Sequence, residues 1–98
     1  MTKNKFKRIS FYKAILSLKT EKDVGSFLKD LCTPAELKTF DERWLIAQLL
    51  DEGKLSYRKI CKKTGASTTT ISRVARFLGQ EGNLGYRLVL YRFKRRKK

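Results

Sequence analysis

The hydrophobic positions of this chain recur at intervals of three and four residues, which is the spacing of one face of an α-helix. This spacing predicts a helix over residues 8–19, and a second helix that begins at a capping pattern of Thr20 and Asp23. The apolar residues of the two stripes are Ile9, Tyr12, Ile15 and Leu16, then Val24, Phe27, Leu28 and Leu31. The N-terminal part of the chain is therefore expected to be helical.

A longer helix is predicted from Thr33 to Gly53, with Pro34 at its first position and Glu36 placed to return the capping bond. Its apolar stripe is unusually wide; the members are Leu37, Phe40, Trp44, Leu45, Ile46, Ala47, Leu49 and Leu50. A helix this apolar needs two packing partners. In so short a chain, a second copy of the protein is expected to supply one of them.

Two short helices are predicted next, from Ser56 through Thr64 and from Ser67 or Thr68 through Leu78, joined at Gly65. Two helices joined by a tight glycine turn are typical of a helix-turn-helix. The expected packing positions are Ile60, Cys61, Ile71 and Val74. Cysteine 61 is interpreted as a small packing residue rather than a redox group.

A last helix is predicted over residues 84–92, followed by five consecutive bases at 94–98 that are expected to form a disordered basic tail. Residues 1–7 are expected to form a basic N-terminal arm, and residues 8–53 the core and dimerisation helices. The prediction is a single all-α domain over residues 1–98, because one core is the most that a chain of this length builds.

Charge is the unusual feature of the composition, since 24 Lys and Arg stand against 9 Asp and Glu, a net charge of +15. Residues 1–20 carry six bases and no acid, residues 53–80 carry seven bases and no acid, and residues 81–98 have a net charge of +6. Residues 21–52 have a net charge of −4. This layout favours a polyanion partner that meets the basic blocks, although a merely solubilising surface is the alternative.

The residue types available restrict the chemistry. There is no His, so catalysis or metal binding through imidazole is excluded, and Cys32 and Cys61 alone do not make a structural zinc site. The longest apolar run, residues 44–47, is far shorter than a membrane span. We therefore expect a cytoplasmic binding protein with reduced thiols, and no enzymatic activity, cofactor, metal or membrane partner.

The second helix of the predicted helix-turn-helix presents hydroxyls and guanidinium groups, and no acid, on the side opposite its packing positions. Arg, Ser and Thr all bond to base edges or phosphates in double-stranded DNA. A single hydroxyl can equally be a helix cap, and this is the preferred interpretation for Ser67. The candidate DNA-binding residues are Ser56, Arg58, Lys62, Lys63, Ser67, Thr68, Thr69, Ser72, Arg73 and Arg76.

The stretch from Thr33 to Leu78 resembles the core of the Trp repressor superfamily. The segments GASTTTISRV and GNLGY, the second at Gly82 to Tyr86, are similar to its YerC/YecD-like branch. The resemblance implies a Trp-repressor-like helical bundle that forms an intertwined homodimer. It also implies that residues 56–78 present the DNA-reading unit.

In tryptophan-responsive members of that family, the amino acid lies between the long helix and the recognition helix. The resemblance carries four positions of the possible effector pocket to Thr33, Arg43, Thr70 and Arg73. Two matching positions depart from the family pattern, because Val74 replaces a glycine and Phe77 replaces a small serine. Both changes add bulk where the ligand would lie, so DNA binding without tryptophan is expected.

The function predicted is a sequence-specific transcriptional regulator, a repressor that occupies an operator as a homodimer. The first alternative is a general nucleic-acid binder, RNA-associated or architectural, in which the net positive charge and both tails provide most of the binding. The second is the DNA-binding subunit of a recombination or transposition enzyme. The chain itself has no acidic constellation for two-metal chemistry, since its acids lie mainly in residues 21–52.

Overall fold

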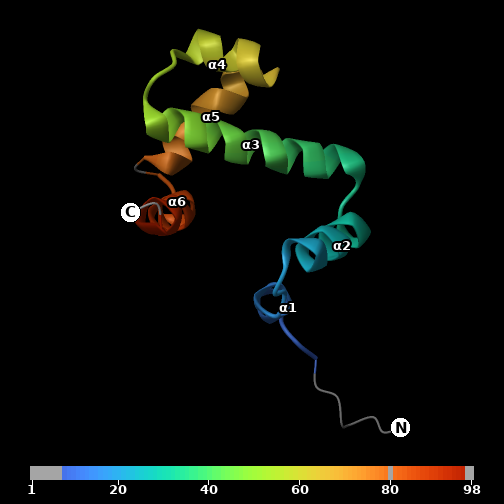
Figure 1. Ribbon diagram of the computed structural model, residues 1–98. Helices are drawn as coiled ribbons and strands as arrows, with labels where there is room; N and C mark the ends of the chain where they lie inside the picture. The colour runs from blue at the N-terminus through green and yellow to red at the C-terminus, as the bar shows by residue number, and fades with distance from the viewer. Residues whose placement is uncertain (1–7, 80, 97–98) are drawn as a thin grey trace, which may run out of the picture. The chain divides into compact units, whose positions relative to one another are not determined.

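The computed structural model describes residues 8–79 and 81–96, and this part of the chain is all-helical, as predicted (Figure 1). The predicted arm at residues 1–7 lies outside the described residues, as do Lys97 and Lys98. The helices are α1 (Phe11–Leu16), α2 (Glu21–Leu31), α3 (Pro34–Glu52), α4 (Tyr57–Thr64), α5 (Thr68–Leu78) and α6 (Gly85–Arg96).

The chain divides into two compact units, Met1–Leu37 and Lys38–Lys98. The first unit contains α1 and α2, and neither helix has a buried residue. The second unit contains most of α3 together with α4, α5 and α6. A division at this place has a physical reason, since an element that buries nothing within its own chain adds nothing to a shared core.

Helix α1 is shorter than the predicted 8–19. Its N-cap is Ser10, whose hydroxyl accepts a hydrogen bond from the Lys13 amide over 3.1 Å, and the helix begins at Phe11. It ends at Leu16, because the next residue, Ser17, donates its hydroxyl to the Ala14 carbonyl over 2.7 Å. A serine that bonds locally to the backbone competes with continuation of the helix. Within the same unit, the rings of Phe11 and Phe27 lie 6.2 Å apart, centroid to centroid.

The capping pattern predicted for α3 is present in full. The Thr33 hydroxyl accepts from the Glu36 amide over 3.1 Å, and the Glu36 carboxylate accepts from the Thr33 amide over 2.8 Å. Both bonds satisfy amides that have no partner within the helix. At the other end the helix stops at Glu52, and Gly53 follows with a φ of +72°, which favours glycine.

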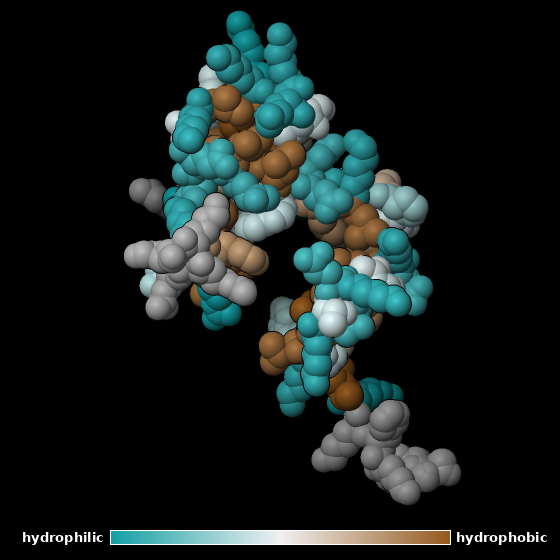
Figure 2. Space-filling model, viewed as in Figure 1, coloured by the Kyte–Doolittle hydropathy of each residue, from teal (hydrophilic) through white to brown (hydrophobic). Residues whose placement is uncertain are grey.

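The core of the second unit lies where α3, α4 and α5 meet (Figure 1). Its buried residues are Ile46, Ala47, Leu49, Ile60, Ala66, Ile71 and Val74. Only part of the wide apolar surface of α3 is used in this core, because Phe40 is 49% exposed and Leu45 is 38% exposed. In Figure 2, apolar patches are visible on the surface between hydrophilic side chains.

Helix α6 extends through Arg96, four residues past the predicted end. The disordered tail predicted from Lys94 is therefore wrong for residues 94–96, which are helical. Two causes account for the difference: Arg and Lys are good helix formers, and Lys94 pairs with Asp51 of α3 over 2.8 Å. Helix α6 also buries Leu90, which is 8% exposed.

Candidate nucleic-acid interface

The turn between α4 and α5 is fixed by a glycine and a hydroxyl. Gly65 has a φ of +80° and donates its amide to the Cys61 carbonyl over 2.8 Å. The Thr64 hydroxyl donates to the Ile60 carbonyl over 2.8 Å and accepts from the Ala66 amide over 3.1 Å. These bonds satisfy the groups that the end of α4 leaves free, so the direction in which α5 starts is set by short local contacts.

Two of the candidate hydroxyls act as helix caps. Ser56 accepts from the Lys59 amide over 3.2 Å at the start of α4, and Ser67 accepts from the Thr70 amide over 3.1 Å at the start of α5. The Ser67 and Thr70 hydroxyls also lie 3.2 Å apart, within hydrogen-bond distance of each other. The structure thus places Ser67 in the capping role that the sequence analysis preferred for it.

Helix α5 has one buried face and one exposed face. Ile71, Val74 and Leu78 are buried, with at most 6% of each residue exposed. The remaining candidates on α5 lie away from these positions. Four of them are exposed and Ser72 is half-buried; the exposed ones are Thr68, Thr69, Arg73 and Arg76. On α4, the candidates Arg58, Lys62 and Lys63 are exposed. The structure therefore leaves every candidate at least partly accessible to a macromolecular partner.

The two arginines of α5 contact neighbouring side chains. The Arg73 guanidinium carbon lies 4.7 Å from the centroid of the Phe77 ring, and that of Arg76 lies 5.9 Å from it. The Arg76 Nε atom also lies 3.3 Å from a carboxylate oxygen of Glu81. Glu81 is the only acid between residues 53 and 98. The one negative side chain of this basic region therefore forms an ion pair with Arg76.

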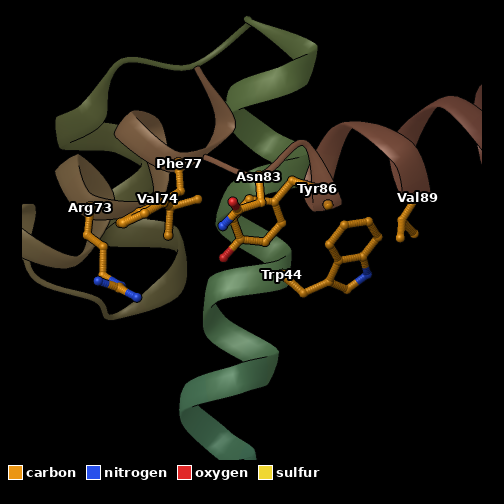
Figure 3. Close-up of a pocket in the computed structure, with 8 residues that line it drawn as sticks. Trp44, Arg73, Val74, Phe77, Asn83, Tyr86 and Val89 are labelled. Carbon is orange, nitrogen blue, oxygen red and sulfur yellow. The ribbon is translucent and has the colours of Figure 1, made fainter. Parts of the chain in front are cut away.

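A hollow of about 610 Å³ opens beside α5 (Figure 3). Of the residues predicted for an effector pocket, Arg73, Val74 and Phe77 line it. The other lining residues were not predicted, because they come from α3 and from the segment that contains α6; they are Trp44, Asn83, Gly85, Tyr86 and Val89. The packing of α3 and α6 beside α5 brings these residues together, and no local pattern in the sequence signals it.

The other three predicted pocket residues do not line this hollow. Thr33 caps α3 in the first unit, and the Thr70 hydroxyl lies against Ser67. Arg43 stands on α3, and its Nε atom is buried with no hydrogen-bond partner among the described residues. Of the six predicted pocket residues, three line the hollow and three do not.

Two other kinds of site are absent from the described part of the chain. Within residues 8–79 and 81–96, no three His, Cys, Asp or Glu side chains are grouped so that they could hold a metal ion. Over the same ranges, no helix is both long enough and apolar enough to cross a membrane.

Comparisons with known proteins agree with the resemblance noted in the sequence. YerC of Bacillus subtilis (strain 168), which is named as an uncharacterized protein, is 45% identical over 83 residues, or 85% of this chain and 78% of YerC. The crystal structure of a TrpR-like protein from Eubacterium eligens ATCC 27750 matches with a TM-score of 0.79 and 43% identity, covering 85% of this chain and 84% of that one.

A second crystal structure, of a Staphylococcus aureus protein provisionally named a Trp repressor, matches with a TM-score of 0.78 and 37% identity. It covers 85% of this chain and 81% of the other. The family model described as Trp repressor protein matches residues 8–94, which is most of the chain. The protein therefore belongs to the Trp repressor family and is similar to its YerC-like branch.

Proposed function

We propose that this protein is a DNA-binding transcriptional regulator that acts in the cytoplasm as a homodimer, with α4 and α5 as a helix-turn-helix and α5 as the helix that reads the major groove. One observation carries the proposal. Helix α5 buries its apolar face and leaves Thr69, Arg73 and Arg76 on its accessible side, while α4 and α5 contain no acid. Double-stranded DNA presents the acceptors that these donors require.

The exposed bases of α4 complete the interface. Arg58, Lys62 and Lys63 are placed on the helix that, in a helix-turn-helix, crosses the DNA backbone. At the start of α5, the free amides favour an anion such as a phosphate. In the proposed arrangement, the bases of α4 and this helix start hold the backbone, and Thr69 and Arg76 reach the base edges.

The test is selection of bound sequences from random DNA by the purified protein, followed by measurement of affinity for the selected site and for random DNA. We expect specific binding to be at least a thousandfold tighter than non-specific binding, within the range of about 10³ to 10⁷ known for specific DNA-binding proteins. Equal affinity for all sequences would contradict the proposal and favour the general nucleic-acid binder instead.

Variants then assign the roles within the interface. Arg76→Ala and Thr69→Ala are expected to reduce the preference for the selected site, because each removes a base contact, worth about 1–3 kcal/mol for Arg76. Truncation after Lys94 is expected to weaken binding to all sequences about equally, with the salt slope falling by about 0.9 for each phosphate contact that the truncation removes. Lys29→Ala, which removes a charge from α2, is the control and should leave the preference unchanged.

Two features support the homodimer. The first unit exposes large apolar side chains that nothing in its own unit covers, such as Tyr12 and Leu16, each 82% exposed. In addition, the Nε atom of Arg43 is buried with no hydrogen-bond partner among the described residues, and an acceptor from a second copy would satisfy it. Sedimentation should show a dimer at micromolar concentration, and Leu16→Glu should shift it toward monomer. A compact wild-type monomer that melts cooperatively at that concentration would contradict the dimer.

Tryptophan is not expected to control this regulator. Val74 is 1% exposed within the core, and the Arg73 guanidinium lies on the Phe77 ring. Both side chains line the hollow beside α5, and they take up space there that a glycine and a serine would leave open. Affinity for the selected site should be the same without tryptophan and with millimolar tryptophan. A tenfold tightening, equal to about 1.4 kcal/mol of coupling, would contradict this. The double change Val74→Gly with Phe77→Ser should instead create a response.

A further inference from the structure

The end of α3 carries a nearly buried carboxylate that contacts two cations of α6. The side chain of Asp51 is only 11% exposed, and its oxygens lie 2.8 Å from Lys94 Nζ and 3.5 Å from Arg87 Nη1. A charge that is this far removed from water needs compensation by opposite charge and hydrogen bonds. Asp51 therefore gives α6 a fixed attachment point on α3.

Arg87 makes a further bond that Lys94 does not share. Its Nε atom donates to the Leu78 carbonyl over 2.9 Å. Leu78 is the last residue of α5, and the last four carbonyls of a helix have no partner within it. A cation at this end of a helix also interacts favourably with the helix dipole. One guanidinium thus joins the C-terminal ends of α3 and α5 to α6.

We infer that Arg87 is a positioning residue that fixes the tilt of α5, with Asp51 orienting its guanidinium group. This inference rests on the proposed function, in which α5 reads DNA. The apolar face of α5 packs against α3 and α4 through Ile71 and Val74, which lie near the middle of the helix. In the inferred arrangement, this contact alone would leave α5 a freedom to tilt about its middle. A bond at its last residue, from a planar group that is itself held by Asp51, removes this freedom.

The contacts of Arg87 with Leu78 and Asp51 are expected to affect which spacing of DNA half-sites the dimer prefers. Helix α5, with 11 residues, is about 16 Å long, so a tilt of about 20° about its middle, where Ile71 and Val74 are buried, moves each end by about 3 Å in opposite directions. This displacement is close to the rise of about 3.4 Å for one base pair. A dimer whose reading helices are held rigidly will therefore reject a site altered by one base pair, and a dimer whose reading helices rock will accept it.

The chain offers a matched pair of variants for the test. Arg87→Gln and Lys94→Gln each remove one positive charge from α6 and one ion pair with Asp51, but only Arg87→Gln removes the bond to α5. The full-length proteins are compared for affinity to the selected site, to random DNA, and to versions of the site lengthened or shortened by one base pair at its centre.

We expect wild type and Lys94→Gln to bind the altered sites at least tenfold more weakly than the selected site. For Arg87→Gln this discrimination should fall to threefold or less, while its affinity for random DNA equals that of Lys94→Gln. A merely stabilising contact would not change the spacing preference of the folded dimer. Discrimination in Arg87→Gln equal to that in Lys94→Gln would overturn the inference.

A second measurement needs no DNA, so it separates this inference from the proposed function. Amide hydrogen exchange at Phe77, Leu78 and Gly79 should be at least tenfold faster in Arg87→Gln than in Lys94→Gln, because the end of α5 is released only in the first. Equal exchange rates in the two variants would overturn the inference that Arg87 holds the end of α5. If wild type shows no preferred DNA sequence, the proposed function fails, and the exchange comparison still decides whether Arg87 holds α5.

A third variant applies if Arg87→Gln does not fold. Arg87→Lys keeps the charge but replaces the planar fork by a single ammonium group, which does not serve Asp51 and the Leu78 carbonyl in the same geometry. The same changes in spacing preference and in exchange are expected at smaller size. Wild-type values for both would overturn the inference.

Discussion

Helices in the two units of the chain start with the same kind of cap, but they differ in how many of their residues are buried. Thr20 in the first unit and Ser67 in the second each accept an amide hydrogen bond three residues on. The helices α1 and α2 nevertheless bury no residue, whereas α4 and α5 bury Ile60 and Ile71 completely. The comparison teaches that short local bonds decide where a helix starts, and that burial decides whether it persists.

Capping alone does not stabilise the first unit. A cap contributes about 1 kcal/mol, and isolated helices shorter than about 12–15 residues are marginal in water. Helix α1 has 6 residues and α2 has 11, so both fall below that length. The stability of the first unit must come from contacts beyond those within it, which agrees with the homodimer proposed above.

The largest effect is expected from the core of the second unit. Ile71→Ala should lower the free energy of unfolding by about 2–5 kcal/mol, because it removes a side chain with no exposed surface. The matched change in the first unit is Leu16→Ala, at a residue that is 82% exposed. Urea denaturation at two protein concentrations measures both.

The change in stability caused by Leu16→Ala shows whether Leu16 is buried by a partner. A decrease in stability of less than about 0.5 kcal/mol that does not depend on concentration would mean that Leu16 remains in water, and would count against its burial in a dimer. A larger decrease that depends on concentration would mean that a partner covers it.

The next effect concerns two glycines. A Cβ atom at Gly82 would overlap the Phe77 carbonyl oxygen, so Gly82→Ala should destabilise the second unit by at least about 1–3 kcal/mol. Gly25 lies within α2, and a Cβ atom there meets nothing within 4 Å. Gly25→Ala should therefore stabilise the protein by about 0.5–1 kcal/mol. Thermal melting of both variants provides the measurement.

The opposite sign at Gly25 would be informative. Destabilisation by Gly25→Ala would mean that the open space beside α2 is filled in the assembled protein by another backbone. A neutral Gly82→Ala would mean that the segment after α5 moves away from Phe77 at little cost, and the contrast between the two units would then be weaker.

The smallest effects are expected at the caps. Ser67→Ala should lower the free energy of unfolding by about 1 kcal/mol, since it leaves the Thr70 amide without its partner. Thr20→Ala removes the equivalent bond to the Asp23 amide. Its effect should be similar if the first unit unfolds together with the second, and close to zero in the global transition if the first unit unfolds earlier. Ser26→Ala, at an exposed position in α2, is the control.

Features set by local contacts were predicted well from the sequence. The starts of α2, α3, α4 and α5 were found because a Ser or Thr cap acts within three residues. The turn at Gly65 was found because a positive φ favours glycine. The Trp repressor family assignment is confirmed, since the family model matches residues 8–94.

Features set by contacts between distant residues were missed. The end of α6 depends on Lys94 and Asp51, which are far apart in the sequence. The hollow beside α5 includes Trp44 and Tyr86 only because α3 and α6 both reach that helix. The bond from Arg87 to Leu78 has the same origin. Such contacts follow from packing, and a periodic pattern does not specify which helices meet.

The pairing of Arg76 with Glu81 has a consequence for the speed of association. Both side chains are more than half exposed, and exposed side chains change rotamer in picoseconds to nanoseconds. A diffusing duplex approaches far more slowly than that, so the pair opens and closes many times during one encounter. In the proposed interface, Glu81 therefore affects association only through its negative charge, which slightly lowers the rate at which DNA is attracted to the basic surface. Added salt screens this effect.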